Sequence, residues 1–500
     1  MLRILLSFAP KDPDQDDETQ ISIYHREQNM EIKRTPSFPK AHSSVQLSSL
    51  STPHLKAKTK ATRGRAGNDR TWLRSNAAAL TILLLAPLLA LSFHLALHHF
   101  HGSVSELLVA VSRQGFLSVF HAHAPSFSWK GTLAYTSWVV LQVALFVYLP
   151  GPVNKGQRTP AGNVLEYQTN GLLAWAVTHV LYLGLSWLGI LDPAFIPRNW
   201  GGLVVACNVT GFALAGLAYA KAHLMPSHPG DSKTTGSVLY DFYMGVELNP
   251  RIGSRFDLKL FTVGRLGMTA WTLIDASYIA YQYQALGRVE PSLALVTTLH
   301  VLYVVDFFIN EAWYLKTIDI AHDHYGFYMA WGSCAWLPMI YTLPAQYTGL
   351  GHPASPPSST YLALVFATGL AAYAVFRDVN SQRDRFRRSG GRCLVWGRPA
   401  GHIRARYTTS DGAEHHSLLL CSGWWGWSRH ANYTADLVLS FCMCALAGGP
   451  GPLTWFYGLF MSGLLVHRCV RDEARCSAKY GASWDDYRRR VPWRLVPGVI

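Results

Sequence analysis

Ionisable side chains are concentrated in one otherwise apolar stretch, residues 304–332. Asp319, His322 and Asp323 follow one another at the spacing that places side chains on one face of a helix. Charged groups are costly at membrane depth and usually have a function there. The pattern predicts a polar pocket wall that delivers a proton into an apolar cavity. The alternative is ion pairing between helices, for example of Lys316 with Asp319 or Asp323.

A second candidate site is the basic segment 383–398, RDRFRRSGGRCLVWGR. The planar fork of arginine suits phosphate oxygens, including the 2′-phosphate of NADP. The alternative is an ordinary positively charged loop on the inner side of a membrane. No GxGxxG motif lies between a strand and a helix, so a Rossmann domain is not expected. A nicotinamide cofactor would have to bind between the helices and these loops.

A metal centre is not expected. His94, His98, His99 and His101 resemble one histidine box of the membrane di-iron enzymes, but those enzymes need several such boxes. Interfacial histidines are the simpler interpretation. The eight cysteines contain no CxxC pair, which argues against zinc and favours reduced structural thiols.

The composition indicates that these groups are carried by a membrane protein. Of 500 residues, 49% are hydrophobic and only 15% are charged, against about 25% charged in ordinary globular chains. This excludes a secreted disulfide scaffold, a disordered chain and a soluble dehydrogenase. The net charge of +14 fits loops at an anionic membrane surface and a phosphate-bearing ligand, and no nucleic acid partner is expected.

The positioning elements are predicted to be transmembrane helices. Apolar runs of near-spanning length, about 20 residues, occur near 77–99, 132–150, 171–191, 200–221, 266–285, 292–310, 326–348 and 359–377. A further run, 435–466, is broken by Gly448–Pro452 and reads as a helical hairpin. The fold class is therefore all-α, a polytopic transmembrane bundle of about ten helices. Residues 402–420 alternate apolar and polar around Asp411-Gly412, which predicts a β-hairpin.

Two domains follow from this pattern. Residues 1–76 lack the apolar content to fold and are expected to form a disordered, polar and basic tail, which the basic stretch 56–74 places in the cytosol. Residues 77–500 form the membrane domain. Loops are expected at 222–265 and 378–431, followed by a polar C-terminus from His467.

Two long segments carry a resemblance to a known family. GSVLYDFYMGVELNPRIG (236–253) and LLVHRCVRDEARCSAKYGASWDDY (464–487) resemble the two signatures of the membrane sterol reductases, which reduce ring or side-chain double bonds with NADPH. The segments NEAWYLKTIDIAHDHYGFY, CLVWGR and VPWRLVPG are similar to the branch that acts on the sterol C7–C8 bond. The resemblance runs from about residue 76 to Ile500.

The resemblance implies an NADPH site in the C-terminal half, about 378–500. The implied cofactor-binding residues are Arg383, Arg387, Leu420, Trp425, Asn432, Tyr433, Asp472, Cys476, Ser477, Ala478, Lys479, Tyr480 and Tyr487. Arginine and lysine would hold phosphates, and the aromatic residues would stack on rings. Lysine is more usual than Arg383 at its position. The basic segment 383–398 and the last signature must then meet on one side of the membrane.

The implied activity is reduction of the C7–C8 double bond of Δ5,7-sterols, of the 7-dehydrocholesterol to cholesterol type, by protonation and then hydride transfer. Such chemistry needs an acid that desolvation keeps protonated. The catalytic candidates are Glu311, Asp319, Asp323, Tyr433 and Asp436.

Three alternatives remain open: a Δ14- or side-chain sterol reductase, an isoprenylcysteine-type methyltransferase, and a lamin-B-receptor-like scaffold. The expected partners are a sterol substrate, the lipid bilayer and possible other sterol-pathway enzymes. The expected location is the endoplasmic reticulum membrane, in which the chain would be multi-pass.

Overall fold

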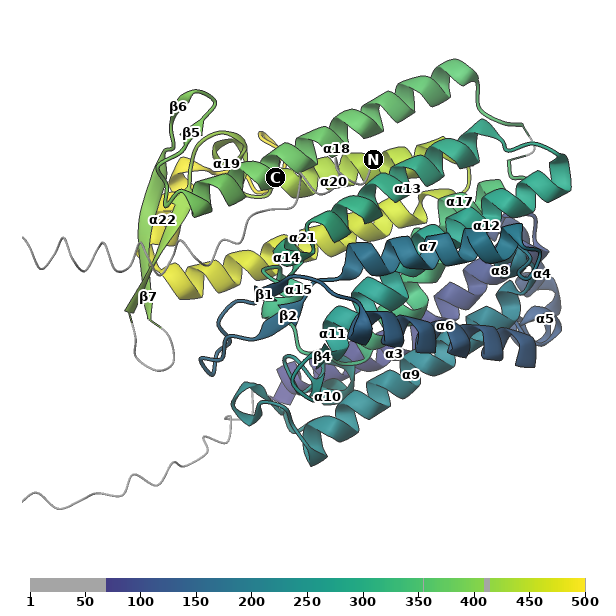
Figure 1. Cartoon of the computed structure of the whole chain (residues 1–500), viewed down its shortest axis with the longest axis horizontal. Coiled ribbons are helices and arrows are strands. Elements are labelled where there is room, and N and C mark those ends of the chain that lie inside the picture. Colours follow the sequence, from purple (N-terminus) through teal and green to yellow (C-terminus); the bar gives the residue numbers. More distant parts are fainter. Residues whose placement is uncertain (1–68, 354, 409–413, 500) are drawn as a thin grey trace, which may run out of the picture.

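The computed structural model describes residues 69–353, 355–408 and 414–499 as a bundle of helices with a small polar cap at one end (Figure 1). Within these residues, five helices are long and apolar enough to cross a membrane: α3 (Asp69–His99), α6 (Trp129–Tyr148), α9 (Trp200–Leu224), α13 (Pro291–Ile309) and α18 (Ser359–Arg388). The chain is therefore a membrane protein, and the predicted all-α class is confirmed.

Each predicted apolar run is helical, although several are shorter or broken. The other helices of these runs are α7 (Gly171–Trp187), α12 (Thr269–Leu286), α16 (Phe327–Trp331), α17 (Leu343–Gly349), α20 (Ala431–Leu446) and α21 (Pro452–Tyr480). Wider π-helical turns over Thr262–Met268 and Gly332–Tyr341 precede α12 and join α16 to α17. The predicted helical hairpin is present, because α20 ends at Leu446 and Pro452 begins α21.

Polar segments contain more structure than predicted. The expected loop 222–265 holds α10 (Val238–Met244), β3 (Arg251–Ile252), β4 (Phe256–Asp257) and α11 (Leu258–Phe261). The remaining short helices are α4 (Val104–Gln114), α5 (Phe116–His123), α8 (Phe195–Arg198), α14 (Glu311–Tyr314), α15 (Ile318–Ala321), α19 (Trp424–Trp427) and α22 (Ala482–Arg490). The short strands β1 (Val153–Lys155) and β2 (Glu166–Gln168) form a pair, as do β5 (Leu394–Val395) and β6 (Arg398–Pro399).

Three predicted boundaries were wrong for one reason. Helix α3 begins at Asp69, inside the predicted tail, and α18 continues to Arg388, inside the predicted loop 378–431. Helix α21 likewise runs through the polar C-terminus to Tyr480. Arginine and glutamate are good helix formers, so a helix continues past the point where its hydropathy changes. The rest of the predicted tail, residues 1–68, lies outside the described residues.

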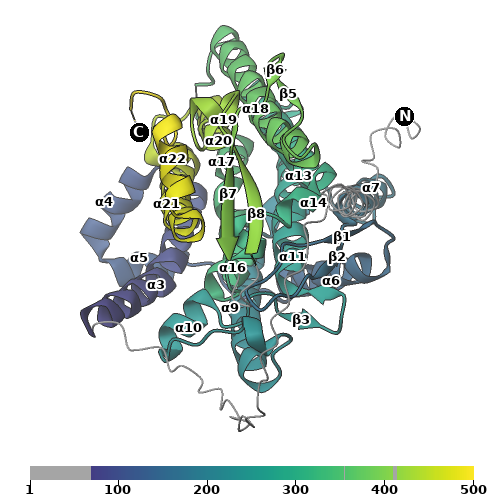
Figure 2. The same ribbon diagram turned by 90° about the vertical axis from the view of Figure 1, so that its left-hand side faces the viewer.

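The predicted β-hairpin is confirmed by β7 (His402–Thr408) and β8 (Glu414–Leu420). The two strands are antiparallel, with His402 opposite Leu420 and Thr408 opposite Glu414. The Asp411-Gly412 turn lies outside the described residues. Together with β5, β6, α19 and α22, this hairpin forms the cap at the left end of the bundle in Figure 1, and Figure 2 shows it beside α21 and α22.

Two apolar clusters fill the interior. One joins α3, α9, α12, α16 and the neighbouring turns around residues such as Tyr278 and Trp331, and the other joins α12, α13, α17, α18, α20 and α21 around Trp271 and Tyr457. Helices α18, α20 and α21 consequently lie side by side and bring their polar ends to the cap (Figure 1).

Candidate active site at the capped end

The site is organised by the polar half of α21. Arg468, Arg471, Arg475 and Lys479 recur every three or four residues, so their side chains lie along one face of the helix. This face lies at the capped end, next to the acid-rich segment 304–332. The arginines were missed as site residues at the sequence level, although their spacing in HRCVRDEARC was a readable signal.

Three of these arginines contact the acid-rich segment. Arg468 Nη2 donates to Asp319 Oδ1 at 2.6 Å, and Arg471 forms an ion pair with Asp323. Arg475 Nη1 donates to His322 Nε2 at 2.7 Å. The proposed pocket wall is therefore lined by ion pairs that join segments far apart in the sequence.

The expected single helical face for Asp319, His322 and Asp323 was wrong. Helix α15 ends at Ala321, and His322 and Asp323 lie in the turn that follows. The turn is fixed by the buried Lys259, whose Nζ donates to the carbonyls of Asp319 and Asp323 at 2.8 and 2.6 Å. All three side chains still face α21, because the turn wraps around one ammonium group.

The alternative pairing partner is not used. Lys316 is exposed, and within the described part of the chain its side chain forms no ion pair with Asp319 or Asp323. The ion pairing proposed as the alternative thus does occur, but with α21.

The charges of the turn are set by this contact. Burial alone would raise the pKa of Asp323, but hydrogen bonds from Arg471 and Tyr328 and the charge of Lys259 lower it below its usual value. Burial and the positive charge of Arg475 lower the pKa of His322 to about 4. A neutral imidazole agrees with its acceptance of a hydrogen bond from Arg475. Asp323 is consequently ionised and is a weak proton donor.

Asp436 and Tyr433 lie on α20, which packs against α18 and α21. Asp436 is 6% exposed, and its Oδ1 has no hydrogen bond partner. Arg468, which pairs with Asp319, also acts electrostatically on Asp436 and Tyr433. Arg468 therefore pairs with Asp319 and lies within electrostatic range of Tyr433 and Asp436. Asp323 pairs with Arg471, which lies one helical turn farther along α21.

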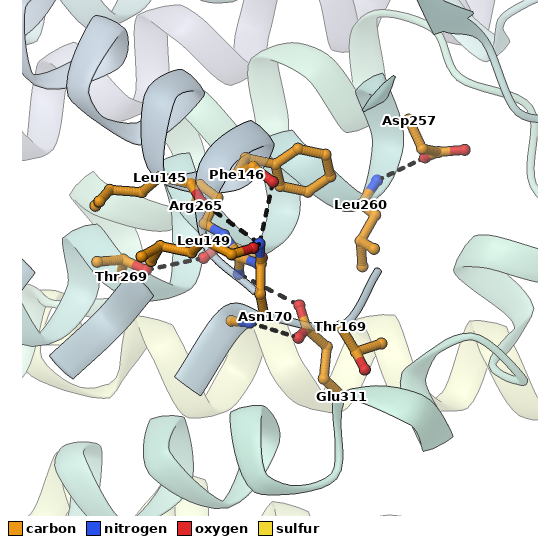
Figure 3. A network of polar contacts seen from close by, with 12 residues as sticks. Leu145, Phe146, Leu149, Thr169, Asn170, Asp257, Leu260, Arg265, Thr269 and Glu311 are labelled. Atoms are coloured by element: carbon orange, nitrogen blue, oxygen red, sulfur yellow. Dashed lines mark hydrogen bonds and ion pairs between the residues drawn. The ribbon is translucent and has the colours of Figure 1, made fainter. Parts of the chain in front are cut away.

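Glu311 lies in a different network (Figure 3). Its Oε1 is 3.3 Å from Arg265 Nη1, and its Oε2 accepts from Gly171 N at 2.8 Å. Arg265 Nη2 also donates to Asn170 Oδ1 at 2.6 Å, and Asn170 caps the carbonyls at the end of α6, for example that of Phe146. Among the described residues Glu311 contacts none of the other catalytic candidates. Glu311 is therefore a buried counter-charge to Arg265, and this network links three helices.

The candidate cofactor residues come together under the cap. The guanidinium of Arg383 lies 4.4 Å from the Trp425 ring centre, and Tyr487 Oη donates to the Trp425 carbonyl at 3.4 Å. Helices α18, α19 and α22 therefore meet at Trp425. The expectation that the basic segment and the last signature share one end of the molecule agrees with this contact.

The other candidates surround this point. Lys479 Nζ lies 3.9 Å from the ring centre of Tyr407, and Tyr480 Oη donates to Ser417 Oγ at 3.4 Å. Asn432 Nδ2 donates to Asn380 Oδ1 at 3.4 Å. Leu420 ends β8 and is buried, as is Cys476, whereas Ser477 and Ala478 are exposed on α21. Asp472 forms an ion pair with Arg475.

A phosphate-bearing dinucleotide fits the groups that lack partners here. Arg383, Arg387 and Lys479 form no ion pair with a carboxylate in the described part of the chain. Asn432 Oδ1 is buried without a hydrogen bond partner. His430 stacks on Tyr433 at 5.0 Å, and its Nε2 lies 4.0 Å from Asp472 Oδ2. Unneutralised cations beside aromatic rings and uncommitted polar atoms suit phosphates, flat rings and ribose hydroxyls.

Other reactive groups form no site of their own. The eight cysteines, all within the described residues, are free thiols. Across the described ranges no three metal-ligating side chains gather. His94 is buried within the protein, and its ring packs 4.7 Å from that of His98.

The fold and this site define a multi-pass membrane protein with a buried acidic centre beneath a basic, aromatic ligand site. Residues 80–500 match the model of the Ergosterol biosynthesis ERG4/ERG24 family. The chain belongs to this family, which comprises membrane sterol reductases.

Relatives of known name agree with this assignment. The chain is 44% identical over 439 residues to the 7-dehydrocholesterol reductase of Danio rerio, covering 85% of this chain and 91% of that protein. It is 42% identical over 439 residues to the 7-dehydrocholesterol reductase of Xenopus laevis, covering 85% and 92%. It is also 37% identical over 420 residues to the Delta(14)-sterol reductase of Methylotuvimicrobium alcaliphilum, covering 84% and 94%.

Proposed function

We propose that this chain is an NADPH-dependent oxidoreductase that reduces the C7–C8 double bond of Δ5,7-sterols, of the 7-dehydrocholesterol to cholesterol type, in the endoplasmic reticulum membrane. The observation that carries the proposal is the buried Asp436, whose Oδ1 has no hydrogen bond partner, on the helix whose first turn also carries the candidate cofactor residues Asn432 and Tyr433. The two relatives with the higher identities above bear the name of this activity.

The chemistry requires an acid inside an apolar cavity. A 5,7-diene has no carbonyl to polarise, so the reaction begins with protonation of C8. The resulting allylic cation is spread over C5 to C7, and a hydride that bonds to C7 leaves the C5–C6 double bond in place. Bound NADPH supplies this hydride.

Asp436 is the preferred proton donor. It is buried and carries an oxygen without a hydrogen bond partner, whereas Asp319 and Asp323 are held as ion pairs by arginines. Burial favours the protonated form of a carboxyl group. The charge of Arg468 opposes this at Asp436, but Arg468 is paired with Asp319. Asp319 then holds Arg468 in place, and Tyr433 contributes an aromatic wall that tolerates positive charge.

The residues of the cap bind and orient the cofactor. Arg383, Arg387 and Lys479 hold its phosphates, and Trp425 and the tyrosines pack against its rings. Asn432 and Asp472 form hydrogen bonds with the amide or ribose groups of the cofactor.

Isotope labelling tests which carbon receives the hydride and which receives the proton. Membranes that contain the full chain receive 7-dehydrocholesterol and NADPH, and the product is analysed by mass and by NMR. We expect cholesterol in which deuterium from 4-deuterated NADPH is at C7 and deuterium from D₂O is at C8. Labels in the reverse positions, or no cholesterol, contradict the proposal. A Δ8,14-diene sterol in a parallel reaction tests the Δ14 alternative, which the 37% identical relative keeps open.

Two matched pairs of variants test the residues. Asp436→Asn should abolish turnover while NADPH binding persists, and Ser440→Ala, one turn farther along α20, should leave turnover within about twofold. Arg383→Gln should weaken NADPH binding roughly 10- to 100-fold, the effect of one charged hydrogen bond. Its control is Arg385→Gln on the same helix, which removes an exposed arginine paired with Asp378. This variant should bind NADPH as tightly as the unaltered protein. Energy transfer from tryptophan to NADPH measures binding independently of turnover.

A further inference from the structure

A basic hollow lies on the cap, outside the candidate cofactor residues. It has a volume of about 640 Å³ and is lined by Arg429, Arg488, Arg489, Arg494 and Trp493, with Asp485 at its edge. We call it the arginine hollow. Four guanidinium groups around one concave surface are suited to an anionic ligand with phosphate oxygens.

The charges of the arginine hollow are not balanced by the protein. Arg429 and Arg494 share one carboxylate, that of Glu473, and Arg494 lies 2.7 Å from it. Arg488 faces Asp485 at 3.7 Å, and Arg489 pairs with Asp486. Four arginines therefore face three carboxylates, which leaves an excess of one positive charge.

One buried donor of the arginine hollow is also unused. Arg429 is only 5% exposed, and its Nε has no hydrogen bond partner. Its Nη1 is committed to the carbonyls of Val491 and Pro492 at 2.6 and 2.9 Å. A buried guanidinium N–H without a partner is costly unless a ligand accepts its hydrogen bond. The excess charge and the free donor fit one singly charged phosphodiester.

An apolar groove of about 640 Å³ starts where the arginine hollow ends. It runs between α18 and α20 and is lined by residues such as Leu364, Leu437, Phe441, Leu495 and Val496. The segment 492–496 forms a wall of both spaces: Trp493 and Arg494 line the hollow, and the next two residues line the groove. The basic and apolar spaces are therefore neighbours along one stretch of chain.

The shared wall is held firmly against the start of α20. Arg429 N donates to the Trp493 carbonyl at 3.0 Å, and His430 N donates to the Arg494 carbonyl at 2.9 Å. Thr434 Oγ1 donates to the Leu495 carbonyl at 2.9 Å. These bonds fix the junction between the hollow and the groove, so both are preformed.

The length of the groove matches one leaflet of a bilayer. Its lining residues on α20 extend from Thr434 to Ala445, which at 1.5 Å per residue is about 16 Å. Half of a hydrocarbon core of about 30 Å is nearly the same length. Because α18 is long and apolar enough to cross a membrane, a groove along it is suited to a lipid chain, and the arginine hollow at the end of the groove is suited to a headgroup.

We propose that the arginine hollow and the apolar groove together bind one anionic phospholipid, with its phosphodiester against the arginines and an acyl chain between α18 and α20. A sterol has no negative charge to neutralise the arginines, and free phosphate has no apolar chain to fill the groove. The lipid site shares no residue with the candidate cofactor set.

Native mass spectrometry of the full chain in detergent tests the site, with dioleoyl-phosphatidylglycerol, dioleoyl-phosphatidylcholine and inorganic phosphate as separate probes. We expect one tightly bound phosphatidylglycerol and weaker phosphatidylcholine. Arg488→Gln with Arg489→Gln should weaken phosphatidylglycerol binding roughly 25-fold, the combined effect of two surface arginines. The matched control is Arg398→Gln with Arg404→Gln, which removes two exposed arginines from the same cap and should retain binding.

A second variant tests the groove without altering charge. Val438 is 41% exposed on α20 and lines the groove, so Val438→Trp fills it with little risk to folding. We expect this variant to lose the tightly bound phosphatidylglycerol, while Val180→Trp, at an exposed site on α7, keeps it. Equal affinity for both lipids, or displacement of phosphatidylglycerol by inorganic phosphate alone, overturns the proposal. So does binding that both Val438→Trp and the arginine double variant leave intact. Since these readouts measure bound lipid, they do not depend on sterol turnover.

Discussion

The ion pair between Asp323 and Arg471 joins the acid-rich turn to α21, and its loss should be measurable. Asp323 is 3% exposed and Arg471 is 35% exposed at their side chains. Asp323 Oδ2 also accepts a hydrogen bond from Tyr328 at 2.7 Å. We predict that Asp323→Asn destabilises the protein and lowers turnover, because Asp319 lies in the short helix before this turn and shares the Lys259 contact with it.

The size of the effect follows from this geometry. A hydrogen bond to a charged group contributes about 1.5–3 kcal/mol, and breaking a fully buried pair costs about 3–5 kcal/mol. Water reaches the exposed third of Arg471 and recovers part of this loss. Asparagine can still accept from Tyr328. We therefore expect Asp323→Asn to cost about 2 kcal/mol, with a coupling energy to Arg471 of about 1–2 kcal/mol.

A double-mutant cycle with Asp323→Asn and Arg471→Gln isolates the coupling. Unfolding by SDS in mixed micelles gives the four free energies. The matched control is the exposed pair Asp485 and Arg488, whose atoms are 3.7 Å apart and whose side chains are about half exposed. Its coupling should be close to zero, because such surface pairs are screened by water.

The dependence on pH supplies an independent check. The pKa of Asp323 is held below its usual value of 3.8, so its stabilising contribution is complete above that pH and is lost as the pH falls through the lower folded value. The gap between wild type and Asp323→Asn should be constant from pH 5 to 7 and narrow below about pH 4. A coupling energy under about 0.3 kcal/mol, or a gap that narrows near neutral pH, would refute the reasoning.

Three further predictions concern groups around the site. Burial lowers the pKa of His430 from 6.5 to about 4, so unfolding free energy should fall as the pH drops from 6.5 to 4, by up to about 3 kcal/mol. His430→Asn should remove the part of this pH-dependent loss that His430 causes. The part caused by His322, whose pKa is lowered to a similar value, should remain. Gly245→Ala should cost about 3 kcal/mol, since Gly245 has φ +91° and a Cβ there would lie 2.3 Å from a backbone carbonyl carbon. Glu311→Gln should cost about 3–5 kcal/mol, because it leaves a fully buried guanidinium without its counter-charge.

Controls exist for each of these. Gly253→Ala adds a Cβ at φ +65° in open space and should cost only about 1 kcal/mol, so equal losses at the two glycines would contradict the packing argument. An unaltered pH profile in His430→Asn would mean that this imidazole is not buried neutral. SDS unfolding measures all three effects, and a stable Glu311→Gln protein would show that the network in Figure 3 is not a structural junction.

The sequence alone determined the membrane class, the helical runs, the β-hairpin and the family signatures. These are local properties, because apolar runs indicate helices and long motifs indicate membership of a family. The basic segment and the last signature could also be expected to meet, and Arg383, Trp425 and Tyr487 do lie together.

Only the tertiary structure decided which acid has which environment. Asp319 and Arg468 are 149 positions apart in the chain, and no local pattern pairs them. Glu311 and Asp436 are both acids within apolar sequence, yet one faces Arg265 and the other keeps an oxygen without a partner. The environment of a carboxyl group depends on which distant helices pack against it, and packing is a property of the assembled bundle.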